Sequence, residues 1–310
     1  MNNHTVPPAI HSPKILAVGG GKGGVGKSLV SILLSIELAH QNKKTIIIDT
    51  DLGGANLHTL MGIKTPTRTL NDFVTRKYGT MEEICIPTPV KNLEIICGAS
   101  EILSLANPQY AQKNKIVQSL IRLPADYVIL DLGAGTSYNV LDFFLIADYP
   151  MVVVTPQPIS IQNAYGFIRN AVYRKLSRMV AQHSFLQKLI TKAMDPKNDT
   201  QMHTIPDLFA AVNKSYNDGI AQQLKSAIDS IKPWIITNNA HDERDQNAGR
   251  IIQLVSEKYL TVSAQTLGTI HSDPRIEELV SKMVSIAELP ASSAARTDVA
   301  VLVRRLLHES

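Results

Sequence analysis

The chain has 310 residues, of which 44% are hydrophobic and 19% charged, as in an ordinary soluble protein with a sizeable core. Its 31 Lys and Arg residues barely outnumber its 27 Asp and Glu residues, so the formal net charge is +4. This balance does not indicate a DNA-binding protein, in which basic residues usually concentrate on one face or tail, although it does not exclude nucleic-acid binding.

Cysteines and apolar runs exclude two further classes. Cys85 and Cys97 form neither a CxxC pair nor a zinc-type spacing, as expected of buried thiols in a reducing cytosol. Nowhere do about 18 apolar residues follow one another, so no membrane-spanning helix is predicted. Residues 1–13 contain three prolines and no apolar run, which predicts a flexible tail rather than a signal peptide. We therefore expect a cytoplasmic protein.

Strands and helices alternate from residue 14 onward. Residues 14–19 are typical of a buried strand, residues 27–40 have the periodicity of a helix, and residues 44–48 form a β-branched run typical of a parallel strand. The alternation predicts an α/β fold with a doubly wound, mostly parallel sheet, in one domain over residues 14–310. Further strands are predicted at 92–97, 127–132, 151–155, 234–237 and 262–268, and helices at 111–123 and 138–146.

One region interrupts this alternation. From about residue 165 to 232 the sequence has helical periodicity throughout, broken by a polar turn at residues 195–200. Because a crossover between parallel strands usually needs one helix, this region is predicted to be a helical insertion on the flank of the sheet. Two interpretations stay open: it covers an exposed face, or it docks a partner.

A phosphate-binding motif follows the first predicted strand. Residues 21–28 read GKGGVGKS and match G-x-x-x-x-G-K-[ST], between a strand and a helix. Glycines let successive N–H groups surround an anion, and the following helix points its positive end at the same place. In such a loop Lys27 reaches the β- and γ-phosphates and the Ser28 hydroxyl binds Mg²⁺. The predicted nucleotide ligands here are Gly21, Lys22, Gly23, Gly24, Val25, Gly26, Lys27, Ser28 and Leu29.

Acidic residues follow two further predicted strands. Asp49 and Asp51 come after residues 44–48, and Asp131 ends an apolar run in the pattern of a Walker-B strand. The carboxyl ends of parallel strands meet at one edge of a sheet, where ligands bind. We therefore predict a Mg²⁺ site made by Ser28, Asp49 and Asp131.

These motifs together resemble the deviant-Walker MinD/ParA family of P-loop NTPases, of the SIMIBI class. The resemblance is carried by KGGVGKS at residues 22–28, IIIDTDLGGANL at 46–57 and VILDLGAG at 128–135. It implies ATP and Mg²⁺ as cofactors and a homodimer that forms on ATP binding. It also implies that Lys22 reaches the nucleotide of the other subunit and that Asp51 orients the attacking water. No Glu follows Asp131, which supports this role for Asp51.

The purine end is predicted from the same resemblance. ITN at residues 236–238 is similar to the family strand that ends in a base-contacting asparagine, here Asn238. Residues 267–273 are similar to the loop that closes over the purine, with His271 where the family usually has proline.

Residues 51–62, 131–137 and 156–165 are most similar to the flagellar-number and flagellar-placement regulators, FlhG/FleN-like proteins. The resemblance implies a slow ATPase, stimulated by a protein partner, that works as a dimerisation switch to position or count a flagellum or similar structure. The tail lacks the glutamine-rich motif of many flagellar members. Residues 299–307 fit a last core helix, or else a short amphipathic helix that would hold the protein at the inner face of the membrane.

Three other functions stay open at this point. A ParA-like partitioning ATPase would bind the nucleoid through a basic surface of the closed dimer. An Mrp-like metallocluster carrier would need cysteines at the dimer interface, and Cys85 and Cys97 lie outside the matching positions. An amidotransferase-type synthetase would need a glutaminase Cys/His pair, which the sequence does not show.

Overall fold

The computed structural model describes residues 12–51, 54, 56–98, 110–195, 204–215 and 218–309. Its centre is an eight-stranded sheet with the strand order β3-β4-β2-β5-β1-β6-β7-β8. Neighbouring strands are parallel except β3, which runs antiparallel to β4. The predicted fold class is therefore confirmed. The strands are β1 (Lys14–Gly19), β2 (Thr45–Asp49), β3 (Ile86–Pro87), β4 (Leu93–Ile96), β5 (Tyr127–Asp131), β6 (Tyr149–Val154), β7 (Trp234–Ala240) and β8 (Gln265–His271).

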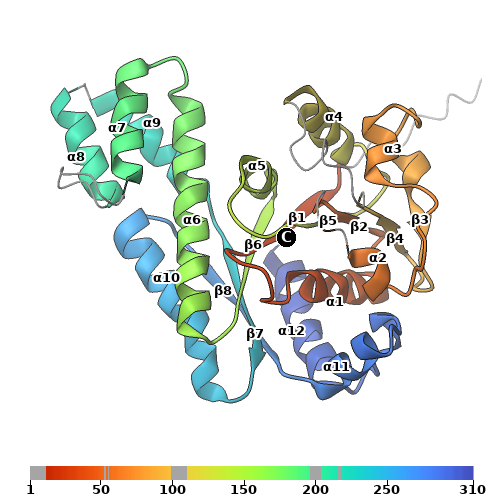
Figure 1. Cartoon of the computed structure of the whole chain (residues 1–310). Coiled ribbons are helices and arrows are strands. Elements are labelled where there is room, and N and C mark those ends of the chain that lie inside the picture. The colour runs from red at the N-terminus through yellow and green to blue at the C-terminus, as the bar shows by residue number, and fades with distance from the viewer. Residues whose placement is uncertain are drawn as a thin grey trace, which may run out of the picture.

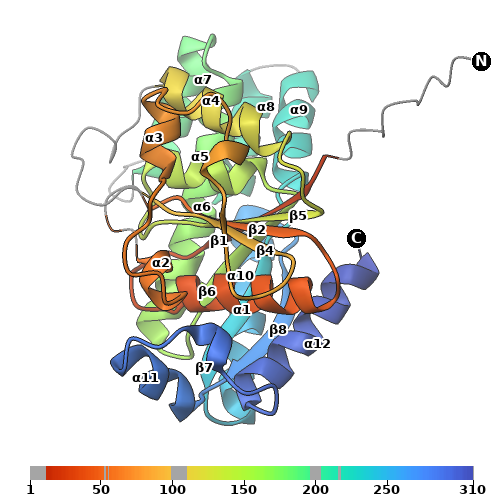
Figure 2. The same ribbon diagram turned by 90° about the vertical axis from the view of Figure 1, so that its right-hand side faces the viewer.

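Helices cover both faces of the sheet (Figures 1 and 2). One face carries α1 (Lys27–His40), α2 (Leu57–Leu60), α11 (Pro274–Ser281) and α12 (Ala294–Glu309). The other face carries the larger layer, and α7 to α9 pack outside it against α6 and α10. This layer consists of α3 (Leu70–Val74), α4 (Tyr110–Leu120), α5 (Tyr138–Ile146), α6 (Pro158–Met179) and α10 (Asn247–Leu260), and the helices outside it are α7 (Ser184–Met194), α8 (Ile205–Ser215) and α9 (Asp218–Asp229).

Alternation along the strands explains the two cores. In β1, Ile15 and Ala17 belong to the core on the α6 side, whereas Leu16 and Val18 belong to the core on the α1 side. Successive side chains of a strand point to opposite faces, so a strand covered on both sides must be apolar at every position. The sheet is held between these two cores, and its carboxyl edge is left for polar residues.

Most predicted elements lie where the sequence placed them. β1, α1 and α5 have the predicted bounds to the residue. β6 begins at Tyr149 rather than at residue 151, because Pro150 lies inside it, paired in register with Ala17 of β1. Proline lacks the N–H that a central strand normally donates, so the sequence pattern placed the start of this strand after Pro150.

The connection from β6 to β7 contains four helices, α6 to α9, in agreement with the helical periodicity of this region. Its first helix begins at Pro158, seven residues before the predicted start, with proline at its first turn, where no intrahelical donor is needed. α6 lies against β6, α5 and α10, while α7, α8 and α9 form a separate lobe at one end of it (Figure 1). The predicted tail falls mostly at residues 1–11, and the polar turn mostly at 196–200, both outside the described residues.

The C-terminal helix α12 packs against β8 and α1. Its apolar side chains Val299, Leu302, Val303 and Leu306 are all buried in the core on the α1 side. This arrangement favours the interpretation as a last core helix over that of a membrane-targeting helix. Within the described residues, no helix is long and apolar enough to cross a bilayer.

Candidate functional site

The loop between β1 and α1 lies at the carboxyl edge of the sheet, at the point where the strand order reverses. Gly24 and Gly26 have φ values of 84° and 90°, a region that favours glycine. A Cβ on Gly21 would lie 2.0 Å from the carbonyl oxygen of Asn163 in α6, and one on Gly26 would lie 2.2 Å from the side-chain nitrogen of Asn238. The loop therefore keeps its shape only with glycine at these positions.

Lys27 is the first residue of α1, and its side chain is folded back over the loop. Its Nζ donates to the main-chain oxygen of Lys22 at 3.5 Å. Burial lowers the pKa of Lys27, and the carboxylates of Asp131 and Asp51 act in the opposite direction. In contrast, Lys22 is exposed. The two lysines of the motif thus face different surroundings, one inside the site and one outside it.

Asp131 ends β5 and is almost fully buried. Its carboxylate accepts hydrogen bonds from the hydroxyls of Ser28 and Ser31, the latter at 3.0 Å. Burial raises the pKa of Asp131 to about 6, although these hydrogen bonds and Lys27 act to lower it. Ser28 and Asp131, both predicted to belong to the Mg²⁺ site, are therefore hydrogen-bonded to each other.

Asp49 ends β2 and is paired in register with Asp131 of the neighbouring strand. Its two carboxylate oxygens accept from the N–H groups of Asp51, at 3.0 Å, and Leu57, at 3.1 Å. Burial, and next the nearby charge of Asp131, raise the pKa of Asp49 to about 7. Asp49 thus fixes the start of the segment that carries Asp51, and it adds a second carboxyl beside Asp131.

The side chain of Asp51 lies over the loop that follows β5. A Cβ on Gly133 would lie 3.2 Å from its Cγ, so this side chain and the loop are in close contact. Its charge also acts on Lys27 and Asp131. The structure therefore brings Lys27, Ser28, Asp49, Asp51 and Asp131 together from three chain segments, as the sequence predicted.

The donor set fits a Mg²⁺–nucleotide complex. The carboxylates of Asp131 and Asp51 act on Lys27, and the pKa values of Asp131 and its neighbour Asp49 are raised, which indicates a site in need of positive charge. In the described part of the chain, no group of three His, Cys, Asp or Glu side chains is placed to hold a metal by itself. Mg²⁺ is usually bound through one or two carboxylates together with substrate phosphates, which is the kind of site that Ser28, Asp49 and Asp131 would complete.

A cavity of about 230 Å³ adjoins the loop and is lined by both residues predicted at the purine end. Asn238 is buried, and its side-chain nitrogen donates to the main-chain oxygen of Val25 at 3.0 Å. His271 lies at the end of β8, where its Nδ1 is 2.9 Å from a carboxylate oxygen of Asp298. Leu29 lines the same cavity. Asn238 therefore holds the loop itself, a contact that the sequence did not predict.

The same cavity has lining residues that sequence reasoning missed. Thr155 follows β6, Asn239 is the next-to-last residue of β7, and Asp273 lies two residues after β8. Their common feature is their position at the carboxyl edge of the sheet, which would have been a usable signal for ligand contacts. The pattern-based prediction considered only positions that matched a family motif.

The family model described as "ParA: NUBPL iron-transfer P-loop NTPase" matches residues 11–180. The chain belongs to the ParA family of P-loop NTPases. Among curated relatives, it is 32% identical to the antiactivator FleN of Pseudomonas aeruginosa over 164 residues, which are 52% of this chain and 57% of FleN. It is also 32% identical to the flagellum site-determining protein YlxH of Helicobacter pylori over 176 residues, 54% of this chain and 59% of YlxH. These matches thus span less than two thirds of either relative.

Solved structures of this ParA-family fold extend the likeness to nearly the whole chain. The cell division ATPase MinD of Pyrococcus furiosus has a TM-score of 0.65 and 16% identity, covering 96% of this chain and 99% of MinD. The MinD of Pyrococcus horikoshii, solved with Mg-ADP, has a TM-score of 0.64 and 18% identity, covering 95% and 96%. At these identities the likeness concerns the fold alone.

Proposed function

We propose that this ParA-family chain is an ATPase that works as a dimerisation switch and positions or counts a cellular structure such as the flagellum. The flagellar part of the proposal is supported by the likeness to FleN and YlxH. The nucleotide part is supported by one observation above all: Lys27, Ser28, Asp49, Asp51 and Asp131 converge on the loop between β1 and α1.

In the proposed cycle, ATP lies on the loop with its purine in the cavity beside Asn238. Bound Mg²⁺ supplies positive charge against the β- and γ-phosphates. Ser28, Asp49 and Asp131 hold it, and Lys27 adds a further charge from inside the loop. Asp51 accepts a hydrogen bond from the water that attacks the γ-phosphate. ADP and phosphate are the products.

Lys22 is the residue that would make the switch a dimer. Its side chain is exposed, while its main-chain oxygen accepts a hydrogen bond from Lys27. The ammonium group of Lys22 therefore extends from the edge of the site. From this edge it can reach a nucleotide in a facing subunit and stabilise charge there. ATP would then join two subunits, and hydrolysis would release them, with a protein partner setting the rate.

The two cysteines do not favour a metallocluster carrier. Cys97 is buried and Cys85 is half-buried, so neither thiol lies open at the surface, where a cluster shared by two subunits would be held. A cluster is held by thiolates. We therefore do not extend to this chain the iron transfer that the description of the family model names.

Light scattering after size exclusion tests the switch directly. With Mg-ATP, we expect Asp51→Ala to form a stable dimer, because it binds ATP but hydrolyses it slowly, and Lys22→Ala to stay monomeric. With ADP, all forms should be monomers. Lys225→Ala, which removes an exposed lysine on α9, is the matched control and should behave as wild type. A wild type and an Asp51→Ala that both remain monomeric in ATP would overturn the dimer.

A further inference from the structure

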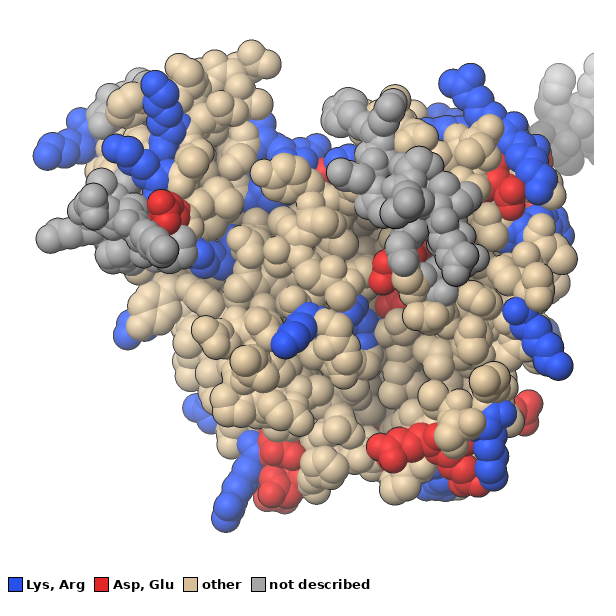
Figure 3. All heavy atoms as spheres, in the orientation of Figure 1, with Lys and Arg blue, Asp and Glu red and all other residues tan. Residues whose placement is uncertain are grey.

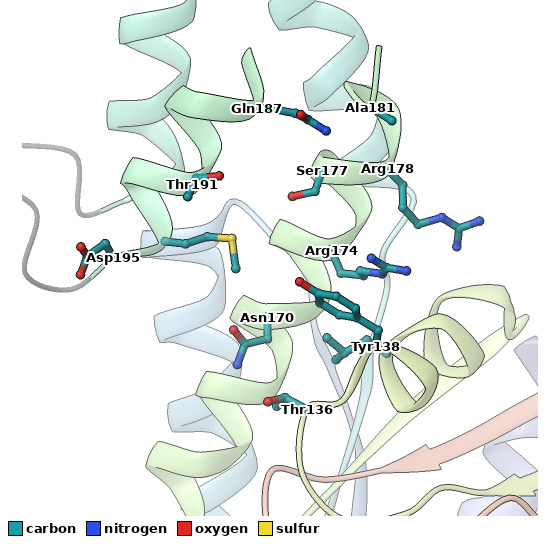
Figure 4. Close-up of a pocket in the computed structure, with 12 residues that line it drawn as sticks. Thr136, Tyr138, Asn170, Arg174, Ser177, Arg178, Ala181, Gln187, Thr191 and Asp195 are labelled. Carbon is teal, nitrogen blue, oxygen red and sulfur yellow. The ribbon is translucent and has the colours of Figure 1, made fainter. Parts of the chain in front are cut away.

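A groove lies between α6 and α7 and is closed at one end by the start of α5. Its volume is about 830 Å³, and its walls include Asn170, Arg174 and Ser177 of α6 and Gln187 and Thr191 of α7. Figure 4 shows Ser177 and Gln187 facing the space between the two helices, whereas Arg174 and Arg178 extend to the side of α6 away from α7, with Arg174 beside Tyr138. We call it the α6–α7 groove. None of the residues of the nucleotide site lines it.

A buried cluster sets the charge of this groove. The carboxylate of Asp142 accepts from Arg174 at 2.8 and 2.9 Å, from Arg178 at 3.3 Å, and from Lys113. Three cations thus share one carboxylate. Arg174 also lies over the ring of Tyr138 at 4.2 Å, which fixes its guanidinium at the groove wall. Arg178 remains half-exposed, and Asp195 is the acidic residue at the far end.

The sequence that surrounds the groove also carries a net positive charge. Between Tyr149 and Met194 there is no Asp or Glu, while six cations occur there: Arg169, Arg174, Lys175, Arg178, Lys188 and Lys192. In Figure 3, blue side chains gather at the upper left, over the lobe that contains α7. A surface of this kind attracts and orients an anionic partner.

The shape of the groove fits a single extended chain. Asn170 and Arg178 lie along α6 about 12 Å apart at 1.5 Å per residue, which matches about four residues of an extended peptide. Asn170 and Gln187 offer amide groups that can pair with a peptide main chain. Leu141 and Met194 provide apolar surface for its side chains. Duplex DNA and lipid head groups instead need cations exposed on an open face, whereas Arg174 is mostly covered.

We propose that the α6–α7 groove binds an acidic segment of a partner protein, with the half-exposed Arg178 pairing one of its carboxylates. The groove is connected to the nucleotide site through the chain itself, because Thr136 and Tyr138 line it and follow Asp131 by a few residues. Docking as such needs no nucleotide. Its dependence on ATP rests on the proposed function, and it makes the groove the place where the partner senses the state of the switch.

A random dodecapeptide library displayed on phage, selected on the full chain without nucleotide, tests the docking. Enriched peptides should be acidic and contain at least one apolar residue. Synthesised with a fluorescent label, they should bind Arg178→Glu at least ten-fold more weakly than wild type. Thr191→Trp fills the groove from an exposed position of α7 without touching the Asp142 cluster, and it should weaken binding as much. Lys188→Glu, an equal charge change on the same lobe, should weaken it less than three-fold.

Three outcomes overturn the proposal: enriched peptides that are not acidic, equal losses in Arg178→Glu and Lys188→Glu, or wild-type affinity in Thr191→Trp. Labelled 20-base-pair DNA and phosphatidylserine vesicles are run in parallel, and binding of either that depends on Arg178 while peptides fail would also overturn it. Repeating the titration with Mg-ATP on Asp51→Ala should change peptide affinity at least three-fold. If peptides bind as expected but no ATP-dependent dimer forms, the proposal for the groove stands and only the proposed dimerisation switch is overturned.

Discussion

Burial raises the pKa of Asp49 to about 7 and that of Asp131 to about 6, with the charge of Asp131 adding to the shift of Asp49 and the charge of Asp51 adding to that of Asp131. An acid whose pKa is higher in the folded than in the unfolded protein costs stability when it ionises. Without nucleotide and Mg²⁺, the folded chain should therefore become more stable as the pH falls from 8 to 5.5. We expect the melting temperature to rise by about 3 °C over this range.

Asp49→Asn isolates the contribution of one group. Asn is isosteric and uncharged, so the melting temperature of the variant should change less than that of wild type between pH 8 and 5.5 in EDTA. Its absolute melting temperature is no test, because Asn has one acceptor oxygen for the two N–H groups that the Asp49 carboxylate accepts from. Differential scanning fluorimetry in matched buffers measures the pH profiles of both proteins. An unchanged pH profile in the variant would show that Asp49 is already ionised in the folded protein at pH 6.

Gly26 offers a test of the loop itself. Gly26→Ala places a Cβ at φ 90° and 2.2 Å from the Asn238 side chain, so the loop must shift. We expect Mg-ATP affinity, measured by isothermal titration calorimetry, to fall at least 100-fold. At Gly23 an added Cβ would meet its nearest neighbour at 3.9 Å. Gly23→Ala should therefore cost less than ten-fold, and similar losses in both variants would contradict this account.

At this scale the positions of the candidate residues were easier to predict than their contacts. Lys27, Ser28 and Asp131 were predictable because the motif and the strand ends together leave little freedom for their placement. The hydrogen bond from Asn238 to Val25 was not predictable, because it joins residues 213 positions apart and depends on the turn of the loop. Asp298, which holds His271, carries no motif at all.

Among the elements, α5 and α6 are joined by the Asp142 cluster. Asp142→Ala would leave Lys113, Arg174 and Arg178 close together without their shared carboxylate. Removing one partner of a buried ionic group typically costs about 3–5 kcal/mol. We expect urea unfolding to show a loss near the lower figure, because Arg178 is half-exposed. Asp229→Ala removes an exposed pair with Lys225 and should cost under about 1 kcal/mol.

The bounds of helices and strands were predictable where the apolar periodicity ends at a glycine or proline. β1 and α1 are separated by glycines, and their bounds were correct. α3 was missed because it has only five residues, although Thr69 and Asp72 form a capping box that could have marked it. α10 and α11 were not predicted, since α10 contains Gly249 in its first turn and α11 has only eight residues, none of them buried.

At the scale of the whole molecule, α12 closes the core on the α1 side. Leu302 is buried against β8, where its side chain would lie 2.4 Å from a Cβ placed on Gly268. Leu302→Ala should lower the free energy of unfolding by about 2–5 kcal/mol. The exposed neighbour Val301 is the control, and Val301→Ala should cost under about 1 kcal/mol. Equal small effects in denaturant titrations would show that α12 is not part of the core.

The strand order has a consequence for synthesis on the ribosome. The phosphate loop precedes α6 and β7 in the chain, yet Gly21 packs against Asn163 of α6 and Val25 accepts a hydrogen bond from Asn238 of β7. A nascent chain whose β7 has not yet left the ribosome has the complete phosphate-binding motif but lacks the hydrogen bond from Asn238 to the loop. Such a chain should not retain ATP. Nucleotide capture is thus a late event in the life of each new molecule, and a truncated translation product would stay outside the nucleotide-bound pool.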